Sequence, residues 1–119
     1  MELFLKHEKL ADAIKRPEFP RRVVHNDTKL NNVLLHQTTG KAICVVDLDT
    51  VMPGCALHDF GDLVRTAANA ADEDETDLSK VQFLPSRFEA IMDGYLLGCQ
   101  GMLIEKEIKK LAIAPIAIT

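Results

Sequence analysis

The sequence predicts an α+β fold that is mainly helical and contains one β-hairpin. Apolar residues recur at intervals of three and four near both ends of the chain, which is the spacing of amphipathic helices. Between these segments, two short apolar runs are separated by a turn, as the strands of a hairpin are. A chain of 119 residues suits one domain or a part of one.

The composition is that of an ordinary soluble protein, with 47% hydrophobic and 27% charged residues. A net charge of -4 without a basic patch argues against nucleic acid as a partner. No apolar run is long enough to cross a membrane, and the N-terminus lacks the order of a signal peptide, so no membrane partner is expected. Cysteines without Cys-x-x-Cys spacing favour reduced thiols and hence a cytoplasmic protein.

The first predicted helix covers residues 2–15, where apolar side chains face one way and charges the other. Pro17 and Pro20 end it, because proline cannot continue a helix. The apolar pair that ends at Val24 predicts a buried strand, or an extended lead into the polar loop 25–31.

The predicted hairpin pairs Val33–Leu35 with the apolar run 42–46 across a turn at residues 38–41. Asn32 precedes the first strand, and Asp47 follows the second. Because the two strands run antiparallel, we expect these polar residues to lie side by side at one end of the hairpin.

After the hairpin, a proline-glycine pair that ends at Gly54 predicts a turn. Asp59 is then expected as the N-cap of a helix over about residues 60–69, with Asp62 in its first turn.

Pro85 begins a clear amphipathic helix. Its apolar stripe is predicted to face the core and consists of Phe88, Ile91, Met92, Tyr95, Leu96 and Cys99. The segment 104–119 begins as a charged helix and ends apolar, without a cap. It either folds back on its own core or, with the face of helix 2–15, forms an apolar surface. In the second case we expect a homodimer or a swapped oligomer.

The polar residues around the hairpin can support phosphoryl transfer. Such an enzyme needs an acceptor for the proton of the nucleophile and oxygen ligands for Mg²⁺. Asp27 can be the base, and Asn32 with Asp47 can be the metal ligands. His25 can brace the loop by hydrogen bonds. Magnesium takes one or two carboxylates plus phosphate and water, which suits this sparse set of ligands.

The segment His25–Asn32 resembles the catalytic loop H-x-D-x-x-x-x-N of the aminoglycoside phosphotransferase and choline kinase-like superfamily. Val45–Asp49 resembles the I-D-x-D segment of that superfamily, and Gly54 with Asp59 fits its G-x-P-x-x-D-L pattern, with Ala56 at the proline position. These segments are most similar to a sugar-kinase branch that includes N-acetylhexosamine 1-kinases and mucin-desulfatase-like regulators.

The resemblance covers roughly residues 19–101 and implies part of the C-terminal, catalytic lobe of a protein kinase-like fold. The N-terminal nucleotide-binding lobe is expected to be absent from residues 1–119, because no glycine-rich loop precedes His25. ATP, as the phosphoryl donor, and Mg²⁺ are then the expected cofactors of a longer parent protein, and the chain alone is expected to be inactive. The acceptor would be a small molecule such as a sugar or an amino alcohol. The alternative is a non-catalytic regulatory or oligomerising module that retains a kinase-like site.

The same resemblance assigns roles to individual residues. It implies Asp27 as the catalytic base and Asn32 and Asp47 as the ligands of Mg²⁺ and its nucleotide. Asp49 would aid a second metal ion or support the loop. Lys29 would contact the transferred phosphate or be an exposed loop lysine.

Residues 59–61 spell Asp-Phe-Gly, the metal-binding motif of protein kinases. In those enzymes the metal-binding aspartate follows the second strand of the hairpin, and Asp47 has that place here. Asp59 is therefore expected to be structural, as a helix cap and an anchor for the backbone of the catalytic loop.

Overall fold

The computed structural model describes residue 12, residues 19–72 and residues 74–118. In this part of the chain, two small antiparallel sheets accompany four α-helices, so the α+β class is confirmed. The predicted helix over residues 2–15 lies outside the described residues, apart from Asp12. No described helix has both the length and the apolar character needed to cross a membrane.

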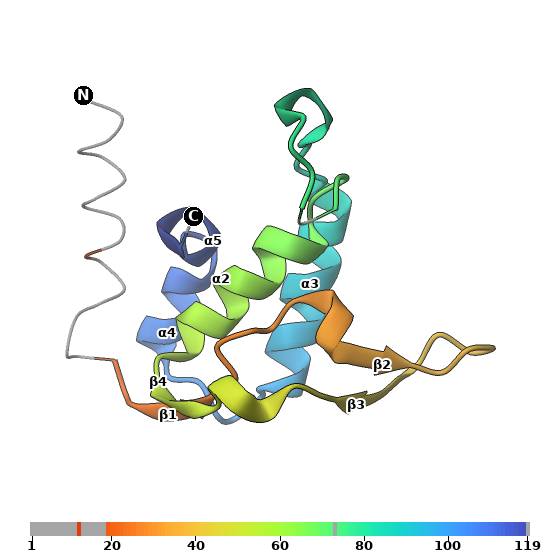
Figure 1. Ribbon diagram of the computed structural model, residues 1–119. Coiled ribbons are helices and arrows are strands. Elements are labelled where there is room, and N and C mark those ends of the chain that lie inside the picture. Colours follow the sequence, from red (N-terminus) through yellow and green to blue (C-terminus); the bar gives the residue numbers. More distant parts are fainter. Residues whose placement is uncertain (1–11, 13–18, 73, 119) are drawn as a thin grey trace.

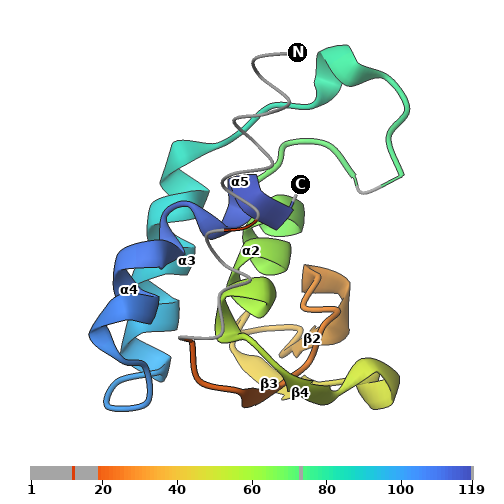
Figure 2. The same ribbon diagram turned by 90° about the vertical axis from the view of Figure 1, so that its left-hand side faces the viewer.

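The strands and helices follow one another as β1 (Arg22–Val24), β2 (Val33–Leu35), β3 (Ala42–Val45), β4 (Met52–Gly54), α2 (Ala56–Ala67), α3 (Pro85–Gly98), α4 (Glu105–Leu111) and α5 (Ala114–Ile118). Short 3-10 turns occupy Leu30–Asn32, Leu48–Thr50 and Leu78–Lys80. The strands gather at one end of the helices in both views (Figures 1 and 2).

Helix α2 lies at the centre of the molecule, with α3 on one side and α4 and α5 on the other (Figure 1). Its apolar residues Leu57, Phe60 and Val64 repeat at three and four, so they share one face. Leu57 and Phe60 are fully buried, as are Leu111 and Ala114 from the C-terminal segment. The hydrophobic core is therefore formed between α2 and the helices around it.

Helix α3 begins at Pro85, as predicted, because the fixed φ of proline suits the first turn of a helix. The ring of Phe88 lies 6.4 Å from that of Phe60, and the ring of Tyr95 lies 5.0 Å from it, between centroids. The Tyr95 hydroxyl donates a hydrogen bond to the carbonyl of Ala56 at 3.3 Å. Burial raises the pKa of this hydroxyl. The predicted core role of the α3 stripe is confirmed for Phe88, Ile91, Met92, Tyr95 and Leu96, which are partly buried against the core, but not for Cys99.

The C-terminal segment folds back onto α2. Of the two alternatives left open for this segment, folding back on its own core is the one found for Leu111 and Ala114, which are both 0% exposed. The physical reason is a reversal after α3, where Gly101 has a φ of 78° that few other residues tolerate. Exposed apolar side chains are found instead on the hairpin, at Leu34, Leu35, Ile43 and Val45.

The predicted hairpin is confirmed: β2 and β3 are antiparallel, with Val33 opposite Val45. The second sheet pairs β1 with β4. A turn, not a strand, was predicted at Gly54, and that prediction is wrong. Gly54 lies so close to β1 that a side-chain Cβ there would come within 2.6 Å of Val24 Cγ2.

Candidate active site

The candidate site is built on the loop that follows β1. The loop turns at Asn26, whose φ of 66° lies in the left-handed region that asparagine tolerates. The Nε2 of His25 donates a hydrogen bond to the carbonyl of Val46 at 2.9 Å, and its Nδ1 accepts one from the N–H of Asp27 at 3.3 Å. This donor and acceptor pattern places the ring proton on Nε2. His25 thus bridges the loop to the hairpin, which is the position expected of a brace.

Asp27 lies among the other predicted residues of the loop. The side-chain amide of Asn32 donates hydrogen bonds to the carbonyl of Asp27 at 2.8 Å and to its carboxylate Oδ2 at 3.1 Å. The Nζ of Lys29 lies 3.5 Å from the same Oδ2. Asn32 is buried, with 6% of its surface exposed, whereas the Asp27 side chain is 28% exposed. The loop therefore presents one carboxylate to solvent and holds it in a fixed direction.

Asn32 and the residue before Asp47 are joined directly. The N–H of Val46 donates to the carbonyl of Asn32 at 2.9 Å, so the two ends of the hairpin strands meet as predicted. Asp47 then adopts a left-handed conformation, with a φ of 61°, and the chain turns into the 3-10 segment that contains Asp49. Asp47 and Asp49 are both exposed. Asn32 and Asp47, two of the predicted metal ligands, thus lie at the same end of the hairpin.

The residues at this end of the hairpin fit a Mg²⁺ ion by their chemistry. The amide nitrogen of Asn32 is engaged by Asp27, so its oxygen is the atom that remains for a cation. The carboxylate of Asp47 supplies a second hard oxygen. Among the described residues, no group of three or more His, Cys, Asp or Glu side chains is arranged to hold a metal ion. A sparse ligand set of this kind suits Mg²⁺, which is completed by phosphate and water.

Asp59 anchors the start of the loop that carries Asp27. Its two carboxylate oxygens accept hydrogen bonds from the N–H groups of His25 and Asn26, both at 2.8 Å. The prediction that Asp59 caps its helix is wrong, because α2 begins at Ala56 with Cys55 as the N-cap. The buried residues at the start of α2 extend the helix one turn toward β4, which turns the Asp59 side chain toward the loop. The predicted anchoring of the loop backbone is what the geometry shows.

A second carboxylate on α2 holds the loop on the other side of Asp27. Asp62 Oδ2 accepts a hydrogen bond from the N–H of Thr28 at 2.9 Å, and Asp62 Oδ1 accepts one from Arg65 Nη2 at 2.8 Å. The sequence interpretation missed this contact and assigned Asp62 only to the first turn of its helix. The available signal was the spacing of three between Asp59 and Asp62, which places both carboxylates on one helix face.

Thr50 is a further residue that the sequence interpretation missed. Its hydroxyl donates to the carbonyl of His25 at 2.6 Å, and its own carbonyl accepts from the side-chain amide of Asn26 at 3.1 Å. The turn after Asp47 is thereby tied to the start of the loop. No local pattern in the sequence distinguishes Thr50 from an ordinary turn threonine.

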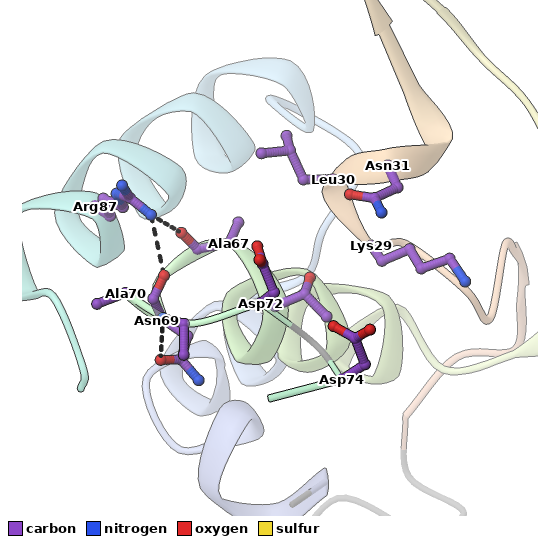
Figure 3. A pocket seen from close by; sticks show the side chains of 11 residues that line it. Lys29, Leu30, Asn31, Ala67, Asn69, Ala70, Asp72, Asp74 and Arg87 are labelled. Carbon is purple, nitrogen blue, oxygen red and sulfur yellow. Dashed lines mark hydrogen bonds between the residues drawn. The ribbon is translucent and has the colours of Figure 1, made fainter. Parts of the chain in front are cut away.

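A cavity of about 650 Å³ lies beside the loop. The loop contributes Lys29, Leu30 and Asn31 to it, and the opposite side is formed by the end of α2 and the segment after it. These remaining lining residues are Thr66, Ala67, Asn69, Ala70, Ala71, Asp72, Asp74 and Arg87. Figure 3 shows Leu30 and Asn31 on one side of the cavity and Arg87 and Asn69 on the other, with Asp72 between them, whereas the Lys29 side chain points away from Arg87. The Nη1 of Arg87 donates to the carbonyl of Asn69 at 3.0 Å, which holds the far side in place.

Comparison with known proteins places this arrangement in context. The model of the family described as "Phosphotransferase enzyme family" (APH) matches residues 2–95 of the chain. Among solved structures, the chain is similar to the crystal structure of an aminoglycoside-3'-phosphotransferase of type VIII, with a TM-score of 0.58 and 20% sequence identity. The match covers 92% of this chain and 39% of that one, so the chain spans less than half the length of that protein. The α+β fold thus matches part of an aminoglycoside kinase fold.

Proposed function

Because the chain belongs to the phosphotransferase enzyme family, we propose that the protein containing it is an ATP- and Mg²⁺-dependent kinase that phosphorylates a hydroxyl group of a small molecule. The observation that carries this proposal is the Asp27 carboxylate, which the amide of Asn32 holds at 3.1 Å beside the end of the hairpin. A carboxylate fixed next to hard oxygen ligands is the arrangement that phosphoryl transfer to a hydroxyl uses.

In the proposed reaction, the Asp27 carboxylate accepts the proton of the acceptor hydroxyl. The oxygen of that hydroxyl forms a bond to the γ-phosphorus of ATP, and the bond from that phosphorus to the ADP oxygen breaks. The products are the phosphorylated acceptor and ADP. Lys29, 3.5 Å from Asp27 Oδ2, is placed to meet the negative charge of the transferred group.

Asn32 and Asp47 are the proposed ligands of Mg²⁺ and, through it, of the nucleotide phosphates. Asp49 is the proposed further ligand if a second ion binds. Bound Mg²⁺ would neutralise charge on the nucleotide phosphates.

The described residues would form part of the C-terminal lobe of a protein kinase-like fold, and the nucleotide-binding lobe would come from the rest of the protein. The 119-residue chain by itself is then proposed to transfer no phosphoryl group. A cytoplasmic protein is proposed because Cys44, Cys55 and Cys99 are free thiols, which suit a reducing compartment.

The acceptor is proposed to bind in the cavity beside the loop. The cavity borders Lys29, which contacts Asp27, so a molecule bound there could bring a hydroxyl to the base. Its lining offers amides from Asn31 and Asn69 and the carboxylate of Asp72, which are groups that hydrogen-bond hydroxyls. A sugar such as an N-acetylhexosamine is the acceptor that we propose, on the resemblance of the catalytic segments to the sugar-kinase branch.

The test is ADP release by the intact protein with ATP, Mg²⁺ and a panel of sugars and amino alcohols, with the phosphorylated product identified by ³¹P NMR. Asp27→Asn is expected to lower kcat by about 10² to 10⁴, as loss of a general base does. Asp93→Asn, on the exposed side of α3, is the matched control and should retain activity. Asn31→Ala should raise the KM for the acceptor and leave that for ATP unchanged. Transfer that persists in Asp27→Asn would refute the role of this base.

One observation favours the second candidate, a non-catalytic oligomerising module. Ile43 and Val45, which lie on one face of β3, are 64% and 50% exposed although both are large and apolar. In the intact kinase these side chains would be covered by the nucleotide lobe. In the chain alone they offer a surface for a second copy, which we propose as the basis of a homodimer or swapped oligomer. No ADP release with any acceptor on the panel, together with a stable dimer, would favour this candidate.

A further inference from the structure

Two carboxylates on α2 hold the backbone on both sides of Asp27. Asp59 accepts from the N–H groups of His25 and Asn26, the two residues before it. Asp62 accepts from the N–H of Thr28, the residue after it, at 2.9 Å. Anchors before and after Asp27 therefore come from one helix.

Asp62 uses a different oxygen for each of its partners. Oδ2 accepts from Thr28, and Oδ1 accepts from Arg65 Nη2 at 2.8 Å and from Arg65 Nε at 3.3 Å. The Asp62 side chain is only 16% exposed. The bond to the loop is thus separate from the ion pair within the helix, and it does not compete with Arg65 for one atom.

Thr28 is fixed by its side chain as well as its backbone. Its hydroxyl donates to the carbonyl of Asp59 at 2.6 Å and lies 3.5 Å from Asp62 Oδ2. Thr28 is therefore attached to α2 at two points, next to the residue that carries the proposed base.

We propose that Asp62 is a positioning residue for Asp27. This inference rests on the proposed function, in which the Asp27 carboxylate must point at the acceptor hydroxyl. Asp59 holds the two amides before Asp27, and the Asn32 amide holds the carbonyl of Asp27. Asp62 holds the N–H of the same peptide unit, that of Thr28, and so fixes the orientation of the backbone that keeps the Asp27 carboxylate within reach of the Asn32 amide.

A purely structural role for Asp62 would be the ion pair with Arg65 on the surface of α2. Exposed pairs of this kind contribute little to stability, so such a role predicts small effects on every measurement. A positioning role predicts a loss in kcat without a matching loss in binding, because the substrates still bind when the base points in the wrong direction.

The kinetic test uses the intact protein with Asp62→Ala, Asp62→Asn and the control Asp93→Ala. Asp62→Ala should lower kcat by about 10²-fold, the size of effect expected from a small misplacement of a catalytic group, and keep the KM for ATP within about twofold. Asp62→Asn keeps one oxygen that can accept from Thr28, so its loss should be smaller. Arg65→Gln should retain most activity, because it leaves the bond to Thr28 intact. A kcat for Asp62→Ala equal to that of Asp93→Ala would overturn the inference.

The second test does not depend on activity. Amide hydrogen exchange measured by NMR in the same proteins should be at least about 10-fold faster for Thr28 in Asp62→Ala, since an amide that has lost its hydrogen bond no longer needs local opening before it exchanges. Exchange at Asn26, which Asp59 holds, should stay as in the wild type. A loss of kcat without faster exchange at Thr28 would overturn the proposal that Asp62 acts on Asp27 through Thr28. Faster exchange at Thr28 without loss of kcat would show that Asp62 has only a structural role. If the wild-type protein transfers no phosphoryl group at all, the proposed function fails, and the exchange of Thr28 still decides whether Asp62 anchors the loop.

Discussion

Arg22 and Glu107 form a two-point ion pair that joins β1 to α4. Arg22 Nε donates to Glu107 Oε1 at 2.9 Å, and Arg22 Nη2 donates to Oε2 at 2.8 Å. The N–H of Ile104 also donates to Oε2 at 2.9 Å, which satisfies the N-cap amide at the start of α4. Glu107 is 0% exposed, so its charge is stabilised inside the molecule by these donors.

Removal of Glu107 should destabilise the fold. Glu107→Ala leaves Arg22 without this partner and removes the acceptor for the N-cap amide of α4. We expect the free energy of unfolding to fall by about 2 to 3 kcal/mol. This loss is smaller than that for a fully buried pair, because Arg22 is partly exposed. Urea unfolding followed by circular dichroism measures the change. Glu105→Ala, on the exposed side of the same helix, is the control and should change the free energy by less than about 0.5 kcal/mol. Equal losses in the free energy of unfolding for the two substitutions would contradict the expected larger contribution of Glu107.

The ion pair should also make stability depend on pH. The hydrogen bonds from Arg22 lower the pKa of Glu107 below its ordinary value of 4.5. A carboxyl whose pKa is lower in the folded state adds stability above its unfolded pKa, and this stability is lost as the pH falls through the folded value. The free energy of unfolding should therefore decrease below pH 4.5. The decrease should be smaller in Glu107→Gln, and an identical pH profile would show that other carboxyls control it.

Substitutions of Asp47 and Asp59 should affect activity in different ways. In the intact protein, Asp47→Ala should raise the Mg²⁺ concentration needed for half-maximal activity, because it removes a proposed ligand. Asp59→Ala should instead loosen the loop and lower kcat at saturating Mg²⁺. Titration of activity with Mg²⁺ distinguishes the two. If Asp59→Ala abolished metal dependence in a folded protein and Asp47→Ala did not, the metal role would belong to Asp59.

The hairpin should control association of the chain alone. Ile43 is 64% exposed, and we expect multi-angle light scattering to show a dimer of the isolated chain at micromolar concentration. Ile43→Lys should shift the mass toward the monomer, because a charge would be buried in the contact. Lys41→Glu, in the turn beside β3, is the control for a changed charge outside the apolar side chains. A clean monomer of the wild-type chain would count against the oligomer.

The elements that the sequence predicted correctly are those whose residue patterns lie within one short segment. The hairpin followed from two apolar runs and a turn, and α3 followed from Pro85 and a stripe at helical spacing. The placement of Asn32 and Asp47 at the same end of the hairpin followed from the antiparallel pairing alone. The gathering of Asp27, Asn32 and Lys29 was accessible for the same reason, since they share one short loop.

The features that were missed depend on contacts distant in sequence. Strand β4 exists because Val24 pairs with Met52, and nothing near Pro53 indicates that partner. The shift of α2 by one turn reflects the burial of Leu57, a property of the assembled core. The anchoring of Thr28 by Asp62 joins a loop to a helix and leaves no periodic pattern.

Helix α2 has two faces with different roles. Leu57, Phe60 and Val64 form the centre of the core, and Asp59 and Asp62 on the same helix hold the loop that carries Asp27. The site and the core thus share one rigid element, and neither can melt independently of the other. Heat should accordingly abolish function in the same cooperative transition that unfolds the domain, with no milder stage in which the core persists and the loop has lost its shape.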